Sequence, residues 1–198
     1  PLVDVYWTTW KSALPYLRKI GARPFYLAEG ADPAFHHPME LERDIDVLFL
    51  GARYGIREKL VSYLQRQGFD VTAYGKGWAG GYVSFEESIE LVNRSKVVLG
   101  IGGVGHLDGV QHLKGRDFEV PMCGAVYLTT YNPELTDWYS VGKDILCYSS
   151  PQNCAETLDW LLRDPDAQAR IRAAALSRAR RDHTWEKRLN ALLGVFKK

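Results

Sequence analysis

Short, almost continuously apolar runs recur along the chain and predict the strands of a buried sheet. The three clearest are residues 45–51, 97–99 and 125–129. Strands that are covered by helices on both faces of a parallel sheet show unbroken runs of this kind. After the first run, Leu60, Val61 and Leu64 share one face at helical spacing. A capping-box pattern then opens a second helix over residues 84–93.

The two ends of the chain predict further elements around this central part. At the N-terminal end we expect a strand over residues 3–9, a helix over 10–20 that Gly21 stops, and a strand over 24–27. Towards the C-terminus we expect a strand over 145–148 and helices that begin near Pro151, Asp164 and Asp182. Residues 29–38 are rich in glycine and proline, which marks a loop or linker.

Strands therefore alternate with helices along most of the chain. This order predicts an α/β fold, a Rossmann-like doubly wound layer structure with a mainly parallel sheet. In such folds, ligands bind outside the carboxyl ends of the strands. Candidate functional residues should accordingly follow predicted strands.

The composition narrows the class of protein. With 198 residues, of which 46% are hydrophobic, the chain is long enough for a well-buried core and fits one or at most two domains. A net charge of +1 argues against binding of nucleic acid, because no strongly basic face would contact a phosphate backbone. No apolar run reaches the roughly 18 residues that span a bilayer, and no signal peptide is visible. We therefore expect no integral membrane segment.

The cysteines point to the redox environment. Cys123, Cys147 and Cys154 are odd in number and lack a CxxC pattern. They predict neither a disulfide framework nor a structural zinc site, so a cytoplasmic location is expected. The first residue is Pro1 and not methionine, which leaves open that the chain is a fragment.

The charged residues of greatest interest stand between Lys114 and Thr130, a stretch that predicts a short helix running into a buried strand. Lys114 and Arg116 lie at the expected helix start, where unpaired backbone amides favour anions. Glu119 follows one turn later and can accept hydrogen bonds from hydroxyl groups. Gly124 is expected to end the helix. Cations, a helix end and a carboxylate together suit a sugar nucleotide; the alternative is an ordinary amphipathic helix with a capping charge.

This stretch also contains a longer pattern, Arg116-Asp117-Phe118-Glu119-Val120-Pro121-Met122-Cys123-Gly124, followed by Leu128-Thr129-Thr130 and Pro133-Glu134-Leu135. The pattern resembles the C-terminal half of GT-B glycosyltransferases, most closely the spore-maturation, CgeB-type branch of group 1. The resemblance covers nearly the whole chain. It implies that Glu119 holds the nucleotide ribose. It also implies metal-independent catalysis, in which Lys114 and Arg116 stabilise the leaving diphosphate while the sugar passes to an acceptor.

The resemblance also implies a division into domains. In that family, a segment like residues 29–38 closes the N-terminal domain, so we expect a boundary near residue 40. Residues 1–40 would be the remnant of an N-terminal domain and the linker, and 41–198 a nucleotide-sugar-binding Rossmann-like domain with C-terminal helices. The implied partners are a nucleotide-diphosphate sugar, the protein's own N-terminal GT-B domain and an acceptor that the sequence does not identify. No cofactor is implied besides this donor substrate.

The end of the first apolar run supplies candidates for the diphosphate site. The chain turns at Gly51 into a helix, and small residues at such a turn let the backbone approach a phosphate. Arg53 and Arg57 follow. Similar enzymes have a glycine-rich turn with a basic residue at this point, so the resemblance makes all three residues candidates. For each arginine, the alternative is a surface position without a specific role.

The next predicted strand, over residues 69–74, ends in a second glycine-rich turn. In the resembled enzymes the loop after this strand lies near the nucleotide base. Tyr74 and Gly75 are therefore candidates for the base site. Trp78 either borders the base as well or fills a hydrophobic gap under the loop.

Residues 100–105 match the GxGxxG pattern letter for letter after a predicted strand. In a dinucleotide-binding protein this pattern leads directly into a regular helix. The residues that follow here contain another glycine and no sustained helical period. We therefore favour a flexible loop that lines the donor pocket, with Gly102 and Gly103 as donor contacts, and keep an NAD-dependent enzyme as an alternative.

His106, Asp108 and His112 raise the question of a metal site, because imidazole and carboxylate groups bind zinc and iron. Their spacing does not match a helical HxxxH pair. We expect no metal and interpret them as loop residues, with His112 a candidate contact to the donor.

One position departs from the resembled family. Retaining members of the wider group often carry two glutamates eight residues apart, and the residue eight before Glu119 is Gln111. An amide can still bind a sugar hydroxyl but carries no charge, so the stereochemical outcome is left open. The sequence favours a glycosyltransferase, or its donor-binding half; a non-catalytic nucleotide-binding module is the other alternative.

Overall fold

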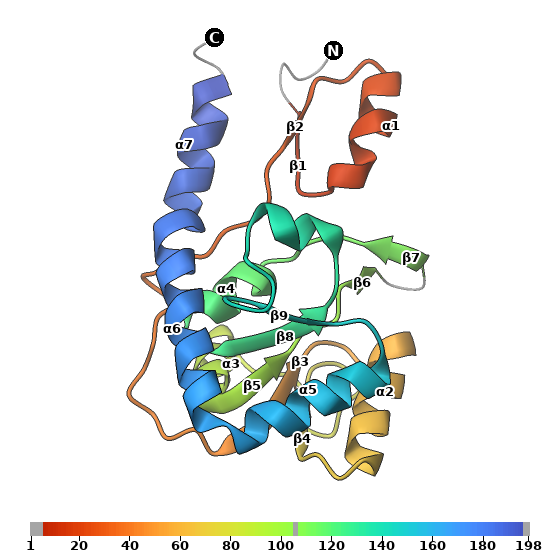
Figure 1. Cartoon of the computed structure of the whole chain (residues 1–198). Helices are drawn as coiled ribbons and strands as arrows, with labels where there is room; N and C mark the ends of the chain where they lie inside the picture. The colour runs from red at the N-terminus through yellow and green to blue at the C-terminus, as the bar shows by residue number, and fades with distance from the viewer. Residues whose placement is uncertain (1–5, 105–106, 196–198) are drawn as a thin grey trace.

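A parallel sheet of five strands forms the centre of the structure, a computed structural model in which residues 6–104 and 107–195 are described (Figure 1). Its order is β4-β3-β5-β8-β9. The strands are β3 (Ile45–Leu50), β4 (Val71–Tyr74), β5 (Ser95–Leu99), β8 (Val126–Thr130) and β9 (Leu146–Tyr148). Each apolar run that predicted a strand contributes one to this sheet. The expected α/β, doubly wound class is confirmed.

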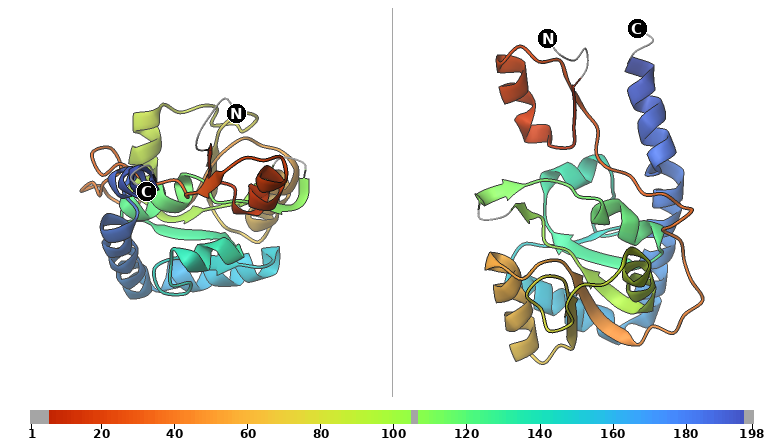
Figure 2. Two further views of the ribbon diagram at one scale, coloured as in Figure 1. Left: turned by 90° about the horizontal axis from the view of Figure 1, so that it is seen from above. Right: turned by 180° about the vertical axis from the view of Figure 1, so that it is seen from behind.

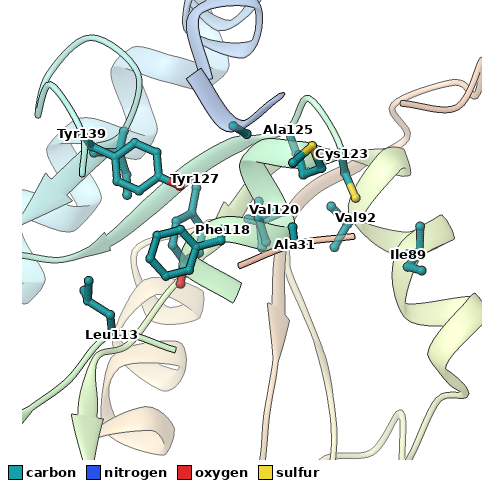
Figure 3. Packing of buried hydrophobic residues seen from close by; sticks show 14 of the residues in the cluster. Ala31, Ile89, Val92, Leu113, Phe118, Val120, Cys123, Ala125, Tyr127 and Tyr139 are labelled. Atoms are coloured by element: carbon teal, nitrogen blue, oxygen red, sulfur yellow. The ribbon is translucent and has the colours of Figure 1, made fainter. Parts of the chain in front are cut away.

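Helices cover both faces of the sheet, which explains why its strands are apolar on both sides. They are α2 (Gly55–Arg66), α3 (Phe85–Arg94), α4 (Arg116–Met122), α5 (Pro151–Arg163) and α6 (Pro165–Asp182). In β3, Leu48 belongs to the hydrophobic cluster of α3 and α4, part of which Figure 3 shows. Its neighbours Val47 and Phe49 belong to the cluster of α2 and α5 on the opposite face. The alternation along β3 thus joins two cores.

Local sequence signals place the ends of two of these helices. Ser84 and Glu87 form both hydrogen bonds of the predicted capping box at the start of α3. Gly124 follows the end of α4 with a φ of 63°, a left-handed conformation that is costly for residues with a Cβ atom. The chain then enters β8 directly. The helix-to-strand transition predicted for this stretch is therefore present.

The order of the strands places a topological switch point at the carboxyl edge of the sheet, between β3 and β5. From β3 the chain first passes to β4 on one side and then returns to β5 on the other side, with Phe49 opposite Leu99. Loops that leave neighbouring strands in opposite directions separate at such a switch point and leave room for a ligand. The residues after Leu50 and Leu99 follow the two strands at this switch point.

The N-terminal segment stands apart from the main sheet, beside the C-terminal helix (Figures 1 and 2). It consists of a two-stranded parallel sheet, β1 (Tyr6–Thr8) and β2 (Pro24–Tyr26), with η1 (Lys11–Ala13) and α1 (Leu14–Lys19) between the strands. The rings of Trp7 and Trp185 meet edge to face with centroids 6.0 Å apart. Trp185, at the start of the last helix, therefore packs against the N-terminal segment.

The C-terminal elements follow the predicted pattern. The 3-10 helix η2 (Pro133–Asp137) comes after β8, Asp164 caps α6, and α7 (Trp185–Val195) ends the chain. No helix within the described residues is both long and apolar enough to cross a membrane.

The glycine-rich run after β5 differs from its prediction. A flexible loop was expected, but the chain forms an antiparallel hairpin of β6 (Gly103–Val104) and β7 (Leu107–Gln111). No helix follows β5 directly, so the GxGxxG pattern lacks the element that a dinucleotide fingerprint requires. A Cβ atom on Gly100 would lie 2.3 Å from the Tyr127 hydroxyl, so this glycine provides space for a neighbouring strand.

Candidate functional site

Two arginines from different elements meet over Gly51 at the carboxyl end of β3. A Cβ atom on Gly51 would lie 3.1 Å from Nη1 of Arg116 and 3.3 Å from Nη1 of Arg57. Arg116 donates from Nη1 to the carbonyl oxygen of Leu50. Arg57, in the first turn of α2, is only 8% exposed and lies over the ring of Tyr54. A side chain at Gly51 would displace both guanidinium groups.

Lys114 completes a group of three cations. Burial, followed by repulsion from Arg57 and Arg116, lowers the pKa of the Lys114 ammonium group to about 8. Its Nζ donates to the carbonyl oxygen of Gly103 in β6, at 2.9 Å. We call Arg57, Lys114 and Arg116 the cation cluster. Within the described part of the chain, none of the three has an ion-pair partner.

Glu119 lies beside the cation cluster and shares a pocket with Arg116. The pocket has a volume of about 190 Å³ and is lined by His36, Leu50, Ser88, Ile89, Val92, Arg116, Glu119, Val120 and Cys123. Burial raises the pKa of the Glu119 carboxyl, and the charge of Arg116 opposes this shift. The structure thus places a cation and a hydrogen-bond acceptor side by side in one opening, next to apolar walls.

The predicted residues near β4 divide between two places. Gly75 packs against the Gly51 turn, since a Cβ atom on Gly75 would lie 2.5 Å from the Gly51 oxygen. Tyr74, in contrast, lines a separate pocket of about 350 Å³ with residues of α3. Trp78 donates from Nε1 to the Gly51 oxygen and packs on Phe49, so of its two interpretations the structure favours packing under the loop.

Arg53 also lies away from the cation cluster. Its guanidinium forms a 2.6 Å ion pair with Glu58 and lies over the Trp78 ring. Arg53 is not among the residues that line the pocket of Glu119. Of the two arginines proposed from the sequence for this turn, only Arg57 stands with Lys114 and Arg116.

The remaining candidates border the hairpin. Gly103 contacts Lys114 through its oxygen, while the amide of Gly102 donates to Oγ1 of Thr130. Burial and the nearby Lys114 charge lower the pKa of His112. His106 lies outside the described residues. Among those described, no three His, Cys, Asp or Glu side chains are grouped so that they could hold a metal ion.

Two site residues come from the linker and were not predicted from the sequence. Nε2 of His36 lies 4.0 Å from Oε1 of Glu119 and closes one side of the pocket. Glu29 approaches Gly115, and Glu119 raises its pKa in addition to the effect of burial. Glycine and proline content identified residues 29–38 as a loop, but composition carries no information about which element a loop crosses.

The comparisons with known proteins agree with this fold. Residues 53–194 match the family described as glycosyl transferase-like. HepE from Anabaena, solved with UDP-glucose, has a TM-score of 0.74 and 12% sequence identity. The match covers 98% of this chain and 64% of the HepE chain. Sucrose-phosphate synthase from Thermosynechococcus elongatus has a TM-score of 0.72 and 11% identity over 98% of this chain and 58% of its own. The chain therefore spans about three fifths of these structures.

A third structure delimits the matching part. The C-terminal domain of the group 1 glycosyl transferase LpcC from Francisella tularensis aligns over its whole length with 79% of this chain. The TM-score is 0.55 and the sequence identity is 13%. No curated protein sequence matches significantly. At these identities the structures establish the fold, and the family match covers well over half of the chain. The protein belongs to the glycosyl transferase-like family and has the fold of a GT-B C-terminal domain.

Proposed function

We propose that this protein is a glycosyltransferase, or the donor-binding part of one, that binds a nucleotide-diphosphate sugar and transfers the sugar to an acceptor. The observation that supports this most is the cation cluster beside the pocket of Glu119 at the switch point of the sheet. Cations without carboxylate partners favour a multiply charged anion, and a neighbouring carboxylate accepts hydrogen bonds from hydroxyl groups. A diphosphate attached to a ribose satisfies both.

The same cations provide a mechanism for the departure of the nucleotide. As the bond between the sugar and the diphosphate breaks, negative charge grows on the phosphate oxygens. Lys114, Arg116 and Arg57 stabilise the transition state, where this charge is larger, more strongly than they stabilise the ground state. This difference lowers the barrier. The proposed step needs no metal ion to neutralise the leaving group. The acceptor would be bound by an N-terminal GT-B domain, and residues 1–40 would belong to that domain and its linker.

A thermal-shift panel tests the proposed function. UDP, GDP, dTDP, CMP, their sugars and NAD are each added to the protein, and the melting temperature is recorded. Ligands that bind only the native state raise this temperature. Stabilisation by one nucleoside diphosphate supports the proposal, stabilisation by NAD alone contradicts it, and binding without transfer by the full-length protein favours a non-catalytic module.

Replacement of Glu119 by alanine is expected to weaken binding of that nucleoside diphosphate about tenfold, because a hydrogen bond to a charged group is lost. Isothermal titration calorimetry of both proteins measures the change. Glu156, an exposed residue of α5, provides the control, since Glu156→Ala should leave the affinity unchanged. Equal affinities of wild type and Glu119→Ala would remove Glu119 from the proposed site.

Donor binding is also expected to depend on pH through Lys114. The diphosphate binds the ammonium form, and the free protein loses this proton as the pH rises through about 8. The dissociation constant should therefore change little near pH 7, begin to rise as the pH approaches 8, and increase above pH 8 by at most tenfold per pH unit. Calorimetry from pH 7 to 9.5 measures the slope.

The control for this pH dependence is Lys114→Arg, because arginine stays protonated over the whole range. The variant should bind with little change between pH 7 and 9.5. A slope that persists in the variant would assign the titration to another group.

A further inference from the structure

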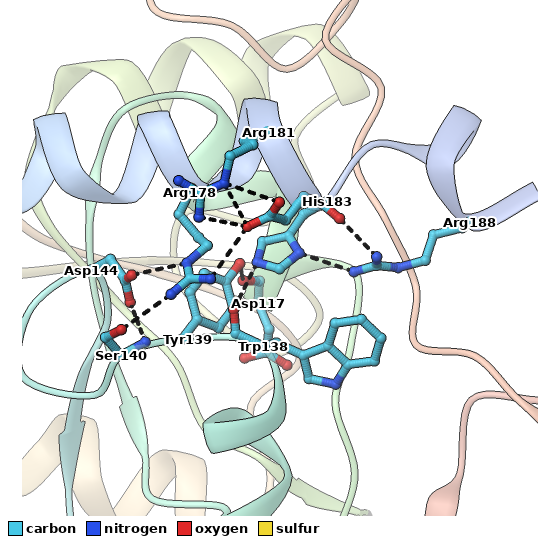
Figure 4. A network of polar contacts seen from close by, with 10 residues as sticks. Asp117, Trp138, Tyr139, Ser140, Asp144, Arg178, Arg181, His183 and Arg188 are labelled. Atoms are coloured by element: carbon cyan, nitrogen blue, oxygen red, sulfur yellow. Dashed lines mark hydrogen bonds and ion pairs between the residues drawn. The ribbon is translucent and has the colours of Figure 1, made fainter. Parts of the chain in front are cut away.

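The position of the Lys114 ammonium group depends on two separate parts of the chain. At the backbone, the amide of Lys114 donates to Oδ2 of Asp117 at 2.7 Å. The carbonyl oxygen of Asp117 accepts in turn from the Tyr139 hydroxyl at 2.6 Å, in the network that Figure 4 shows. At the tip, Nζ donates to the carbonyl oxygen of Gly103 at 2.9 Å. The start of α4 therefore fixes where the side chain begins, and the hairpin fixes where its charge lies.

The contact with Gly103 matters because the other cations repel the ammonium group. Besides burial, the charges of Arg57 and Arg116 lower the pKa of Lys114. Without an acceptor at its tip, the flexible four-carbon side chain would be free to turn away from both guanidinium groups. An ammonium group has three donors, so one hydrogen bond to Gly103 leaves two for a phosphate.

Packing does little to fix the backbone at Gly102 and Gly103. Among the described residues, a Cβ atom on Gly102 would meet nothing within 4 Å, and one on Gly103 would reach only Cγ2 of Ile56, at 4.0 Å. Gly103 pairs with Gln111, but that pairing lies within the hairpin and does not join it to the main sheet. Because glycine adopts many backbone conformations, a defined position of the Gly103 oxygen requires hydrogen bonds from other elements.

Two hydroxyl groups on neighbouring strands supply such hydrogen bonds. The amide of Gly102 donates to Oγ1 of Thr130 in β8 at 3.4 Å, and Thr130 donates to the Tyr148 hydroxyl in β9 at 3.0 Å. Tyr148 donates to the carbonyl oxygen of Gly100 at 2.8 Å. Its side chain is buried in the apolar cluster of α2 and α5, so its hydroxyl group has a fixed position. These bonds connect the main sheet to the backbone that enters the hairpin.

We propose that the hydroxyl groups of Tyr148 and Thr130 position the Lys114 ammonium group within the cation cluster. They do so by fixing the backbone that carries the Gly103 oxygen. The inference rests on the proposed function, because it requires that Lys114 binds the diphosphate. Tyr148 and Thr130 are not among the residues that line the pocket of Glu119. They are positioning residues, which act on donor binding through Lys114.

Calorimetry with UDP, or with the nucleoside diphosphate that the thermal-shift panel selects, tests this role. Tyr148→Phe removes one hydroxyl group and keeps the ring. At pH 7 we expect it to bind the ligand about fivefold more weakly, because the hydrogen bonds that hold Lys114 in place are weakened. Thr130→Val should act in the same direction. Thr130→Ser keeps a hydroxyl group and should bind with nearly the affinity of wild type.

Tyr26→Phe is the matched control. Tyr26 is also a partly buried tyrosine whose hydroxyl donates a hydrogen bond, here to Glu134 at 3.3 Å, but it lies on β2 in the N-terminal segment. This variant should leave the affinity unchanged. A melting temperature for each variant shows that the protein is folded under the conditions of the titration.

The pH dependence of binding separates positioning from stability. Once released from the arginines of the cluster, Lys114 should have a pKa closer to its ordinary value of 10.5. The dissociation constant of Tyr148→Phe should then stay nearly level up to pH 9.5, while that of wild type increases above pH 8. Asp117, Glu29 and His112 also lie near Lys114, but they are the same in both proteins. Burial raises the pKa of Tyr148, so its hydroxyl keeps the proton over this range.

A double-mutant cycle shows whether Tyr148 acts through Lys114. In a Lys114→Ala background, Tyr148→Phe should cause no further loss of affinity. Equal losses in both backgrounds, or a pH profile of Tyr148→Phe that follows wild type, would give Tyr148 a structural role and overturn the inference. An unchanged affinity of Tyr148→Phe would overturn it as well. If Tyr148→Phe does not fold, Thr130→Val is taken through the same cycle.

The same experiments keep this inference separate from the proposed function. Nucleotide binding that depends on Lys114 but not on Tyr148 or Thr130 would overturn only the positioning role. Absence of nucleotide binding by the wild-type chain would overturn both.

Discussion

Replacement of Phe118 by alanine is expected to lower the free energy of unfolding by about 3–5 kcal/mol, the cost typical of a buried phenylalanine. Phe118 is fully buried (Figure 3). Its ring stacks with Tyr139 at a centroid distance of 6.0 Å and meets His183 edge to face at 5.3 Å. Alanine would leave a cavity between α4 and the α6–α7 junction that these rigid rings cannot fill. Urea denaturation monitored by circular dichroism measures the change.

The matched control for this stability effect is Phe35, which is 55% exposed in the linker. Phe35→Ala removes the same ring from a partly solvated position, so it should cost less than half as much. Equal losses in the two variants would show that Phe118 does not hold α4 in place. Because α4 carries both Arg116 and Glu119, we also expect Phe118→Ala to weaken nucleotide binding at temperatures where the protein is still folded.

Replacement of Arg116 by alanine is expected to weaken binding of the nucleoside diphosphate about a hundredfold. Arg116 is central to the cation cluster: it lies beside Arg57 over Gly51, acts on the pKa of Lys114 and lines the pocket of Glu119. Its loss removes a bidentate, charge-assisted donor to phosphate oxygens, which is among the strongest polar contacts available to a protein. Calorimetry at constant ionic strength measures the effect, since salt screens such contacts.

Two further variants separate binding from folding in this experiment. Arg163→Ala removes an arginine whose ion pair with Asp159 is exposed on α5, and it should not change the affinity. Arg116→Lys retains the charge without the fork of two donors, so an intermediate affinity is expected. A melting temperature for each variant shows whether loss of the hydrogen bond that Arg116 donates to the Leu50 carbonyl oxygen destabilises the fold. An affinity of Arg116→Ala within threefold of wild type would contradict the proposed diphosphate site.

Much of the architecture follows from patterns that act over a few residues. Val47, Leu48 and Phe49 alternate between two apolar clusters, which requires helices on both faces of the sheet. In the sequence this requirement appears as an unbroken apolar run. The capping box of α3 and the left-handed conformation of Gly124 also depend only on residues that are close in the sequence. Because all strands are parallel, their carboxyl ends meet at one edge, so residues after separate strands, such as Gly51 and Gly103, are expected near one another.

Other features depend on contacts between distant parts of the chain. Arg53 and Arg57 are equally basic and four residues apart, yet only Arg57 joins Lys114 and Arg116. Arg53 instead pairs with Glu58 and lies over the ring of Trp78, a residue of the turn after β4. The glycine-rich run after β5 forms two antiparallel strands, and its first residue, Gly100, lies against Tyr127 and Thr129 of β8. A sequence pattern does not predict which of these contacts form, because the partner residues come from other elements.

By itself, the sequence determined the class of fold, the alternation of strands and helices, and the helix turn on which Arg116 and Glu119 stand. These depend on periodicity and on backbone preferences, which neighbouring residues set. Only the tertiary structure decided which cations gather over Gly51 and that the linker brings Glu29 and His36 to α4. The physical reason is that Glu29 is placed by Arg188, a residue 159 positions away, through a hydrogen bond that no local pattern encodes.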